Sequence, residues 1–339
     1  MEFRRFVMVL LAGVVGCANA GDVGEPLEAA PAAAPSSGES ASATVACSPS
    51  GGEVIAALPS HPTEGVARGE RVYWSDHAHR LWQHGEGRIA EGVASGSLAP
   101  YGASGVAWVE YGRGGPSFLV TIEPGGSVTA RVPAEAPFVF DETSVYYILS
   151  DVLQVAPLSG GSARPLFTFD RSSSAPSGRG RVVELVGYEV GDLAIVDRHL
   201  YFQDGDAIRR VGAEGGPSHV VVRATATKLV AVDGALYYTD PDATVWRVPL
   251  REGGPTRPIA QLPRGVHVRA VQPSARGGLV VLYTDPAKRR CDGSIARVSA
   301  DGAGGEVLAS DLDHEATLFA SDGPAVFASQ STVYRVAPR

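Results

Sequence analysis

The side chains best suited to metal chemistry are two histidines in the stretch Asp76-His77-Ala78-His79. Histidines separated by one residue lie on the same face of an extended strand, where their imidazoles can share a transition metal. His77 and His79 instead fall where the sequence indicates a hairpin loop, and no Glu or Cys cluster accompanies them. We therefore expect solvated loop histidines, keep His77 and His79 as weak candidates for metal ligands, and expect no cofactor.

The chain lacks the sequence motifs of the common hydrolase and nucleotide-binding sites. It contains no Gly-x-Ser-x-Gly elbow, no phosphate loop and no His-Glu-x-x-His sequence. A catalytic site could still be assembled from distant loops, so we predict no catalytic residue without excluding an enzyme. The candidates for ligand contacts are arginines in expected loops: Arg113, Arg179, Arg181, Arg289 and Arg290. Two of them lie in a Ser- and Gly-rich insertion, which either binds a ligand or is neutral drift in a surface loop.

Two cysteines, Cys47 and Cys291, are candidates for a disulfide, and free thiols are the alternative. A bridge between them would fasten the start of the folded domain to a distant hairpin. In a four-stranded meander the two positions are expected on opposite faces, and cysteines whose Cα atoms are more than about 7 Å apart cannot pair. Pairing therefore requires the flexible chain that carries Cys47 to reach across.

Residues 1–17 resemble a bacterial lipoprotein signal peptide. Two arginines precede an apolar run from Phe6 to Val15, which is too short for a permanent membrane span. The run ends in small residues before Cys17, and the resemblance implies cleavage and lipidation there, with stable anchoring by several acyl chains. Ala18 is not the aspartate associated with inner-membrane retention, so the resemblance implies an outer-membrane address. The alternative is an ordinary secretory signal cut near Ala18-Asn19-Ala20.

The composition changes sharply along the rest of the chain. Residues 18–50 are rich in Ala, Pro, Ser, Gly and Glu and lack aromatic residues, which predicts a disordered tether. Residues 51–339 have the length and composition of one large domain. The formal net charge of −8 argues against a nucleic-acid partner, because binding nucleic acid requires a basic surface.

A repeated pattern fills residues 51–339: an aliphatic–aromatic strand, an aliphatic–Arg–Val strand and a Gly-Gly turn. The clearest copy runs from Leu236-Tyr237-Tyr238-Thr239-Asp240 through Val245-Trp246-Arg247-Val248 to Gly253-Gly254. The aliphatic–aromatic strands begin at Val72, Val106, Val145, Leu200, Leu236, Val281 and Val326. Their mean spacing of about 42 residues is typical of propeller blades built from four short antiparallel strands. We therefore predict a single all-β propeller of seven four-stranded blades, with a small aliphatic strand innermost in each.

The two ends of the domain complement each other. The last unit stops at Arg339 after its second strand, and the missing third strand matches Gly51-Gly52-Glu53-Val54-Ile55-Ala56. We therefore predict that the last blade is completed by strands from both ends of the chain, which leaves no open sheet edge between blades. The alternative is that Gly51-Gly52 merely ends the tether.

The strands Tyr73-Trp74-Ser75-Asp76, Tyr237-Tyr238-Thr239-Asp240 and Tyr283-Thr284-Asp285 resemble the Tyr-Trp-Thr-Asp repeats of LDL-receptor-type β-propellers. The overall pattern is also similar to uncharacterised lipoprotein propellers of bacteria. The resemblance implies binding or scaffold domains, although the receptor domains have six blades. Because the aspartates recur at one repeat position, we expect them to close their own hairpins by Asx-type hydrogen bonds.

Two functions of different classes follow. The first is a lipid-anchored, non-enzymatic propeller that binds a protein, peptide or glycan at the bacterial cell envelope. The alternative is a metal-dependent hydrolase or lyase of the lactonase-like kind, with its site at the axis. The expected inner strands, such as Leu229-Val230-Ala231, are largely apolar and offer no ligand set, which favours the binding module.

Overall fold

The computed structural model describes residues 47–94, 97–102, 105–111, 117–122, 128–134, 137–169, 193–232, 234–250, 254–274, 276–288, 291–321 and 323–336. They belong to one compact unit that begins at Ala46. These ranges contain strands and turns but no helix, and thus no helical segment able to cross a bilayer.

The described strands are β1 (Gly52–Ala57), β2 (Pro62–Arg68), β3 (Arg71–Asp76), β4 (Arg80–Gln83), β5 (Gly87–Glu91), β6 (Ala99–Tyr101), β7 (Gly105–Glu110), β8 (Phe118–Ile122), β9 (Val128–Pro133), β10 (Phe138–Phe140), β11 (Ser144–Leu149), β12 (Val152–Pro157), β13 (Arg164–Thr168), β14 (Ala194–Val196), β15 (His199–Asp204), β16 (Ala207–Gly212), β17 (His219–Val222), β18 (Lys228–Val232), β19 (Ala235–Thr239), β20 (Thr244–Pro249), β21 (Arg257–Gln261), β22 (His267–Pro273), β23 (Leu279–Thr284), β24 (Gly293–Val298), β25 (Gly305–Leu312), β26 (Thr317–Ser321), β27 (Val326–Ser329) and β28 (Thr332–Val336).

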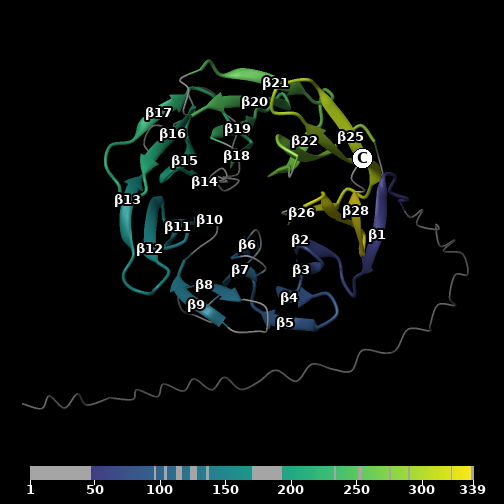
Figure 1. Cartoon of the computed structure of the whole chain (residues 1–339), viewed down its shortest axis with the longest axis horizontal. Coiled ribbons are helices and arrows are strands. Elements are labelled where there is room, and N and C mark those ends of the chain that lie inside the picture. The colour runs from purple at the N-terminus through teal and green to yellow at the C-terminus, as the bar shows by residue number, and fades with distance from the viewer. Residues whose placement is uncertain are drawn as a thin grey trace, which may run out of the picture. The chain divides into compact units, whose positions relative to one another are not determined.

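Five sheets each contain four consecutive strands, beginning at β6, β10, β14, β18 and β22. Neighbouring strands within these sheets are antiparallel, as in the pairs β18–β19 and β19–β20. The first strand of each sheet lies nearest the centre of a ring and the last lies at its rim (Figure 1). Turns between strands use glycine where φ must be positive, as at Gly215 and Gly216, whose φ angles are 90° and 107°.

The sixth sheet has eight strands in the order β1-β28-β27-β26-β2-β3-β4-β5. Its two halves meet where β2 and β26 pair in parallel, at Val66 with Ala320 and Ala67 with Ser321. Small residues permit this approach, since a Cβ on Gly65 would lie 2.5 Å from the Phe319 ring. The predicted all-β propeller is confirmed, and its described strands form five separate four-stranded sheets and one eight-stranded sheet.

The two ends of the domain share this eight-stranded sheet. β1 pairs with β28 in antiparallel register, with Val54 opposite Tyr334 and Ala57 opposite Thr332. The expected pairing of the N-terminal strand with the strand carrying Tyr334 is therefore present. β1 completes the half-sheet formed by β26, β27 and β28, so the ring is closed by strands from both ends (Figure 1).

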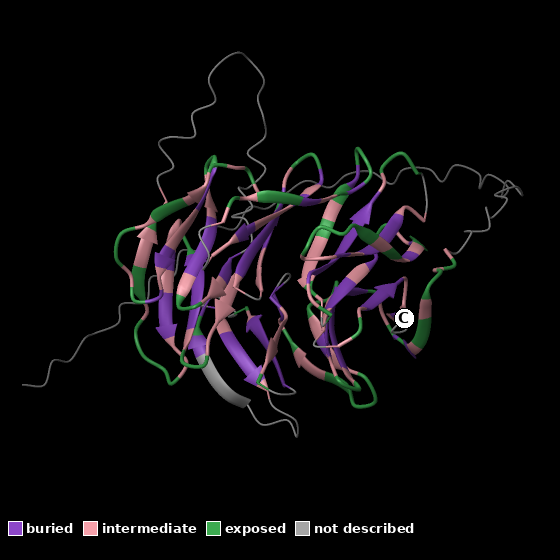
Figure 2. Cartoon of the chain, turned by 45° about the horizontal axis from the view of Figure 1, so that its top comes forward, coloured by how far each residue is buried: buried purple, intermediate pink, exposed green. Residues whose placement is uncertain are grey.

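Side-chain alternation explains why the second strand of each unit carries aromatic residues. In β19, Tyr237 packs with Val281 and Tyr283 on one face, whereas Tyr238 packs with Tyr201 on the other. Successive side chains of a strand point to opposite faces, so one aromatic doublet fills the gaps toward both neighbouring sheets. Buried strand centres and exposed turns follow this arrangement (Figure 2).

A disulfide joins Cys47 to Cys291 with a Cα–Cα distance of 5.4 Å. The expected obstacle of opposite faces does not arise, because the chain before β1 runs beside β25. The amide of Ser50 donates to the carbonyl of Ser310 at 3.1 Å, and the two hydroxyls lie 2.9 Å apart. These contacts hold the chain ahead of β1 against the domain as far as Cys47.

Candidate binding site at the mouth of the ring

A cavity of about 610 Å³ opens where β2, β22 and β26 begin. The turn between β3 and β4 contributes His77, and the segment before β26 contributes His314 and Glu315. Its volume lies within the range of roughly 300–1,000 Å³ that small-molecule sites occupy. We call this cavity the mouth cavity; its lining residues are Pro62, Thr63, Glu64, His77, Arg269, Ala270, Leu282, His314, Glu315, Ala316, Thr317 and Leu318.

Two inner strands of the mouth cavity depart from the regular repeat. The register of β2 against β3 shifts between Pro62 and Glu64, which leaves Thr63 as an extra residue. The register of β22 against β23 shifts between Val268 and Ala270, which leaves Arg269 as an extra residue. The other inner strands pair with their neighbours without a shift over the described residues. Bulges re-aim side chains and are frequent next to functional sites, so this corner of the ring is the candidate site.

The charged groups of the mouth cavity differ in the hydrogen bonds and ion pairs that they form. Glu64 accepts hydrogen bonds from the Ser75 hydroxyl at 2.9 Å and from the Leu98 amide at 2.8 Å. Glu315 lies 3.9 Å from His61 and remains about half exposed. Arg269 is exposed and has no hydrogen bond or ion pair with any described residue. Among the described residues the cavity thus presents a guanidinium without a hydrogen-bonded partner, and two carboxylates line the same cavity.

A second cavity of about 300 Å³ lies along the inner strands β6, β10, β14 and β18. Apolar residues line it, among them Phe138, Phe140, Ile195 and Val230. The inner strands on this side of the ring are thus apolar, as the sequence indicates, and they bring no titratable side chain to the cavity. It is therefore a weaker candidate site than the mouth cavity.

The two candidate histidines of the sequence are placed differently. The Nδ1 atom of His79 lies 2.9 Å from the carbonyl oxygen of Val93, and its ring meets the Tyr111 ring edge to face. His77 lines the mouth cavity instead. Within the described ranges no group of three or more His, Cys, Asp or Glu side chains could hold a metal ion.

The remaining candidates of the sequence lie outside the described residues. They are the lipidation site Cys17 and the loop arginines Arg113, Arg179, Arg181, Arg289 and Arg290.

The aspartates of the repeat close their own hairpins. Asp76 is 3% exposed, and its carboxylate accepts from the amides of Ala78 and Arg80 and from the Trp82 indole at 2.8 Å. Arg80 also forms an ion pair with it at 2.8 Å. The carboxylate is therefore engaged by its own hairpin and by the Ser60 hydroxyl, which donates to it at 3.1 Å, and this supports the structural interpretation over a catalytic one.

The hydrogen bond from tryptophan to aspartate recurs and was not expected from the sequence. The Trp246 indole donates to Asp240 at 2.8 Å, as Trp82 does to Asp76. In both hairpins the tryptophan follows the aspartate by six residues. Trp246 also stacks on Tyr238 with centroids 6.1 Å apart. The common Asp-x5-Trp spacing is the signal that could have revealed this contact.

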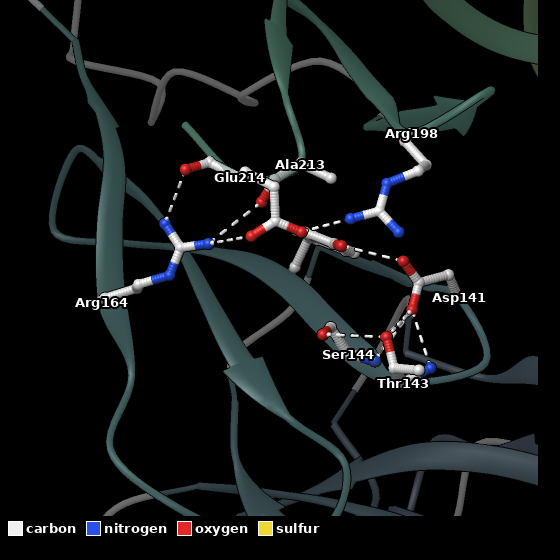
Figure 3. A network of polar contacts seen from close by, with 8 residues as sticks. Asp141, Thr143, Ser144, Arg164, Arg198, Ala213 and Glu214 are labelled. Carbon is white, nitrogen blue, oxygen red and sulfur yellow. Dashed lines mark hydrogen bonds and ion pairs between the residues drawn. The ribbon is translucent and has the colours of Figure 1, made fainter. Parts of the chain in front are cut away.

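A polar network connects the sheets that begin at β10 and β14 (Figure 3). Arg164 of β13 donates to the carbonyl of Glu214 at 3.0 Å and pairs with its carboxylate at 3.2 Å. Arg198 pairs with the other oxygen of the same carboxylate. These groups are largely exposed, and exposed ion pairs contribute little to stability. The network thus links the two neighbouring sheets through exposed polar groups.

The same network contains a tyrosine with a perturbed pKa. Burial, the hydrogen bond to Asp141 and the charges of Asp141 and Glu214 raise the pKa of Tyr146 to about 12. Its hydroxyl donates to the Asp141 carboxylate at 2.8 Å, while the other oxygen of Asp141 accepts from Thr143 and Ser144. The Tyr146 hydroxyl and both oxygens of Asp141 are thus engaged with one another and with the same turn, which supports a structural role for the pair.

Solved structures, among them a WD40 β-propeller, are similar to this chain. The WD40 β-propeller domain of Doa1 has a TM-score of 0.55 at 12% identity, with 86% of this chain and 98% of that chain covered. A chain of the mitotic checkpoint complex has a TM-score of 0.55 at 11% identity, covering 86% and 95%. The GH74 xyloglucanase from Xanthomonas campestris has a TM-score of 0.57 at 14% identity. The match covers 83% of this chain and 52% of the xyloglucanase chain, so this chain spans about half of that enzyme's length.

No protein-family model and no curated protein sequence matches this chain. At identities this low, the similarity to solved structures shows the fold alone. The chain is an all-β propeller, and its function has to be argued from its own residues.

Proposed function

We propose that the protein is a non-enzymatic binding module that holds its ligand or partner at the mouth of the ring. The observation that carries this proposal is the pair of inner-strand bulges, which place Thr63 and Arg269 at one cavity. The recurring aspartates, by contrast, accept hydrogen bonds within their own hairpins. A propeller fold is consistent with a binding or scaffold role, and the mouth cavity supplies a defined place for it.

We also propose that the module is lipid-anchored at the bacterial cell envelope, most simply on the outer membrane. The apolar run ending in Cys17 supports this address, and residues 18–46 would then act as the tether. The Cys47–Cys291 disulfide supports it too, because disulfides persist in oxidising compartments outside the cytosol. The partner class that we propose is a protein, peptide or glycan.

We propose that the eight-stranded sheet corresponds to two blades, which gives seven blades in the ring. Its two halves are joined by only two parallel residue pairs, whereas each half is an antiparallel meander like the other blades. The Asp–Trp contacts within the Tyr-Trp-Ser-Asp and Tyr-Tyr-Thr-Asp units support a kinship with propellers of the Tyr-Trp-Thr-Asp type. The hydrolase alternative has no comparable support in the described residues.

Photo-crosslinking in intact cells of the source bacterium tests the proposed function. β25 runs between Asp301, which precedes it, and His314, which follows it, so the two exposed positions lie at opposite ends of one strand. A photoreactive amino acid at position 314 is expected to yield a reproducible adduct, found by mass spectrometry. The same group at position 301 is expected to yield none. An adduct from position 301 alone, or none from position 314, would contradict the proposal.

The control for the proposed lipid anchor uses the same cells. The Cys17→Ala variant is expected in the soluble fraction, with a loss of the adduct if the partner is membrane-bound. If Cys17→Ala remains in the membrane fraction, the lipid anchor is wrong, whatever the crosslinking at position 314 gives.

A further inference from the structure

The most distinctive group of the mouth cavity is the guanidinium of Arg269. It stands on an inner strand, where the corresponding positions of other sheets are largely apolar, and it is exposed. The bulge between Val268 and Ala270 gives this residue a place outside the regular alternation. No described residue bonds to it, so its donors are available to a ligand.

The charged groups that line the cavity with Arg269 limit the charge of a ligand that can bind there. Glu64 and Glu315 also line the cavity, and Glu64 is held in place by Ser75 and Leu98. A multiply charged anion such as phosphate would be repelled by these carboxylates. A ligand with a single negative group, and with neutral or positively charged donors beside it, fits the cavity better.

The remaining polar groups support a compact organic ligand. His77 lines the cavity and has no hydrogen bond to a described residue, so it can donate or accept according to its tautomer. Leu282 and Leu318 supply apolar lining beside these polar groups. Polar groups that converge on a cavity beside apolar side chains are typical of sites that orient small molecules.

We propose that the mouth cavity binds a small organic ligand through one carboxylate group, which Arg269 holds by paired hydrogen bonds. Guanidinium and carboxylate match in a planar, two-bond geometry that lysine cannot provide. The inference rests on the proposed binding function and makes it specific. A peptide C-terminus and a sugar acid both carry the required group.

Fluorescence titration with a matched pair of probes tests the inference. Dansylglycine and dansylglycinamide differ in the carboxylate, and the wild-type protein is expected to bind dansylglycine more tightly by about tenfold or more. In the Arg269→Gln variant this preference is expected to vanish, while Arg269→Lys retains part of it. Arg257→Gln, an exposed strand arginine that does not line the cavity, is the matched control and keeps the preference.

The outcomes separate this inference from the proposed function. Equal affinity for the two probes, binding of neither, or an unchanged preference in Arg269→Gln overturns the carboxylate site. Displacement of dansylglycine by inorganic phosphate at lower concentration than by acetate also overturns it. Competition by alanylalanine or by glucuronate distinguishes a peptide source from a sugar acid. If the carboxylate site fails while crosslinking at position 314 still succeeds, the binding function stands without it.

Discussion

The Asp76→Ala variant is expected to lose about 2–4 kcal/mol of unfolding free energy, which in a domain of this size corresponds to a decrease in Tm of several degrees. The Asp76 side chain is 2% exposed and carries the ion pair with Arg80. Its removal leaves the Trp82 indole and two backbone amides without their acceptor. Thermal and denaturant unfolding of purified protein measure the effect.

A matched control comes from the same position of another repeat. Asp285 accepts a hydrogen bond from the Ala287 amide at 3.0 Å, without a tryptophan or arginine partner among the described residues. Asp285→Ala is therefore expected to change stability much less than Asp76→Ala. Equal losses in the two variants would mean that the hydrogen bonds of Asp76 to Arg80 and Trp82 contribute nothing to stability, and would contradict the prediction.

The same residue sets part of the acid stability. Burial alone would raise the pKa of Asp76, but hydrogen bonds from Arg80, Trp82 and Ser60 outweigh it and hold the pKa below its ordinary value of 3.8. A carboxyl whose pKa is lowered by folding stabilises the protein above its unfolded pKa. This contribution is lost as the pH falls through the folded pKa. Asp76→Asn is therefore expected to flatten the fall in stability of the wild-type protein below about pH 4.

Removal of the Cys47–Cys291 bridge is the second change with a large expected effect. The bridge closes a separation of 244 residues, and the loss of such a cross-link typically costs about 2–5 kcal/mol. β1 is the outermost strand of its sheet and follows Cys47 closely, so it is the element that the bridge secures. The Cys47→Ser/Cys291→Ser double variant should unfold at a lower temperature than the wild-type protein.

The location of this effect can be checked by amide hydrogen exchange. Faster exchange is expected first in β1 and at Ser50, whose amide bonds to Ser310. Wild-type protein treated with a reductant should behave like the double variant, and the reductant should leave the double variant unchanged. A loss of protection in β10 or β14 without one in β1 would show that the bridge does not secure the closure.

Local signals that recur made most of the fold predictable. The aromatic doublet of β19, the Arg-Val strand β20 and the inner strand β18 all lie where the repeat places them. The pairing of β1 with β28 also followed from the repeat, because the last unit lacked strands that the N-terminal segment supplied. In these cases each strand carries its own alternation and turn residues, so little long-range information is needed.

The mouth cavity could not be predicted in the same way. The bulges at Thr63 and Arg269 depend on the register between two strands, which no single strand specifies. The parallel contact of β2 with β26 depends on Gly65 meeting Phe319, residues far apart in the sequence. The arginines proposed from loop composition lie outside the described residues. Arg269 instead lies in an inner strand, and nothing in the sequence of that strand indicated a bulge.

The closed ring is tested most directly by a cross-link between the two ends of the domain, because this closure brings β2, β22 and β26 together around the mouth. In a Cys17→Ser background, Val54→Cys and Tyr334→Cys replace directly opposed residues of β1 and β28. Val54→Cys combined with Val220→Cys serves as the control, since both positions are exposed but lie in different sheets. Mild oxidation followed by peptide mass spectrometry is predicted to find a bridge between positions 54 and 334 and none between 54 and 220. Absence of the first bridge, or equal yields of the two, would contradict the closed ring on which the mouth cavity depends.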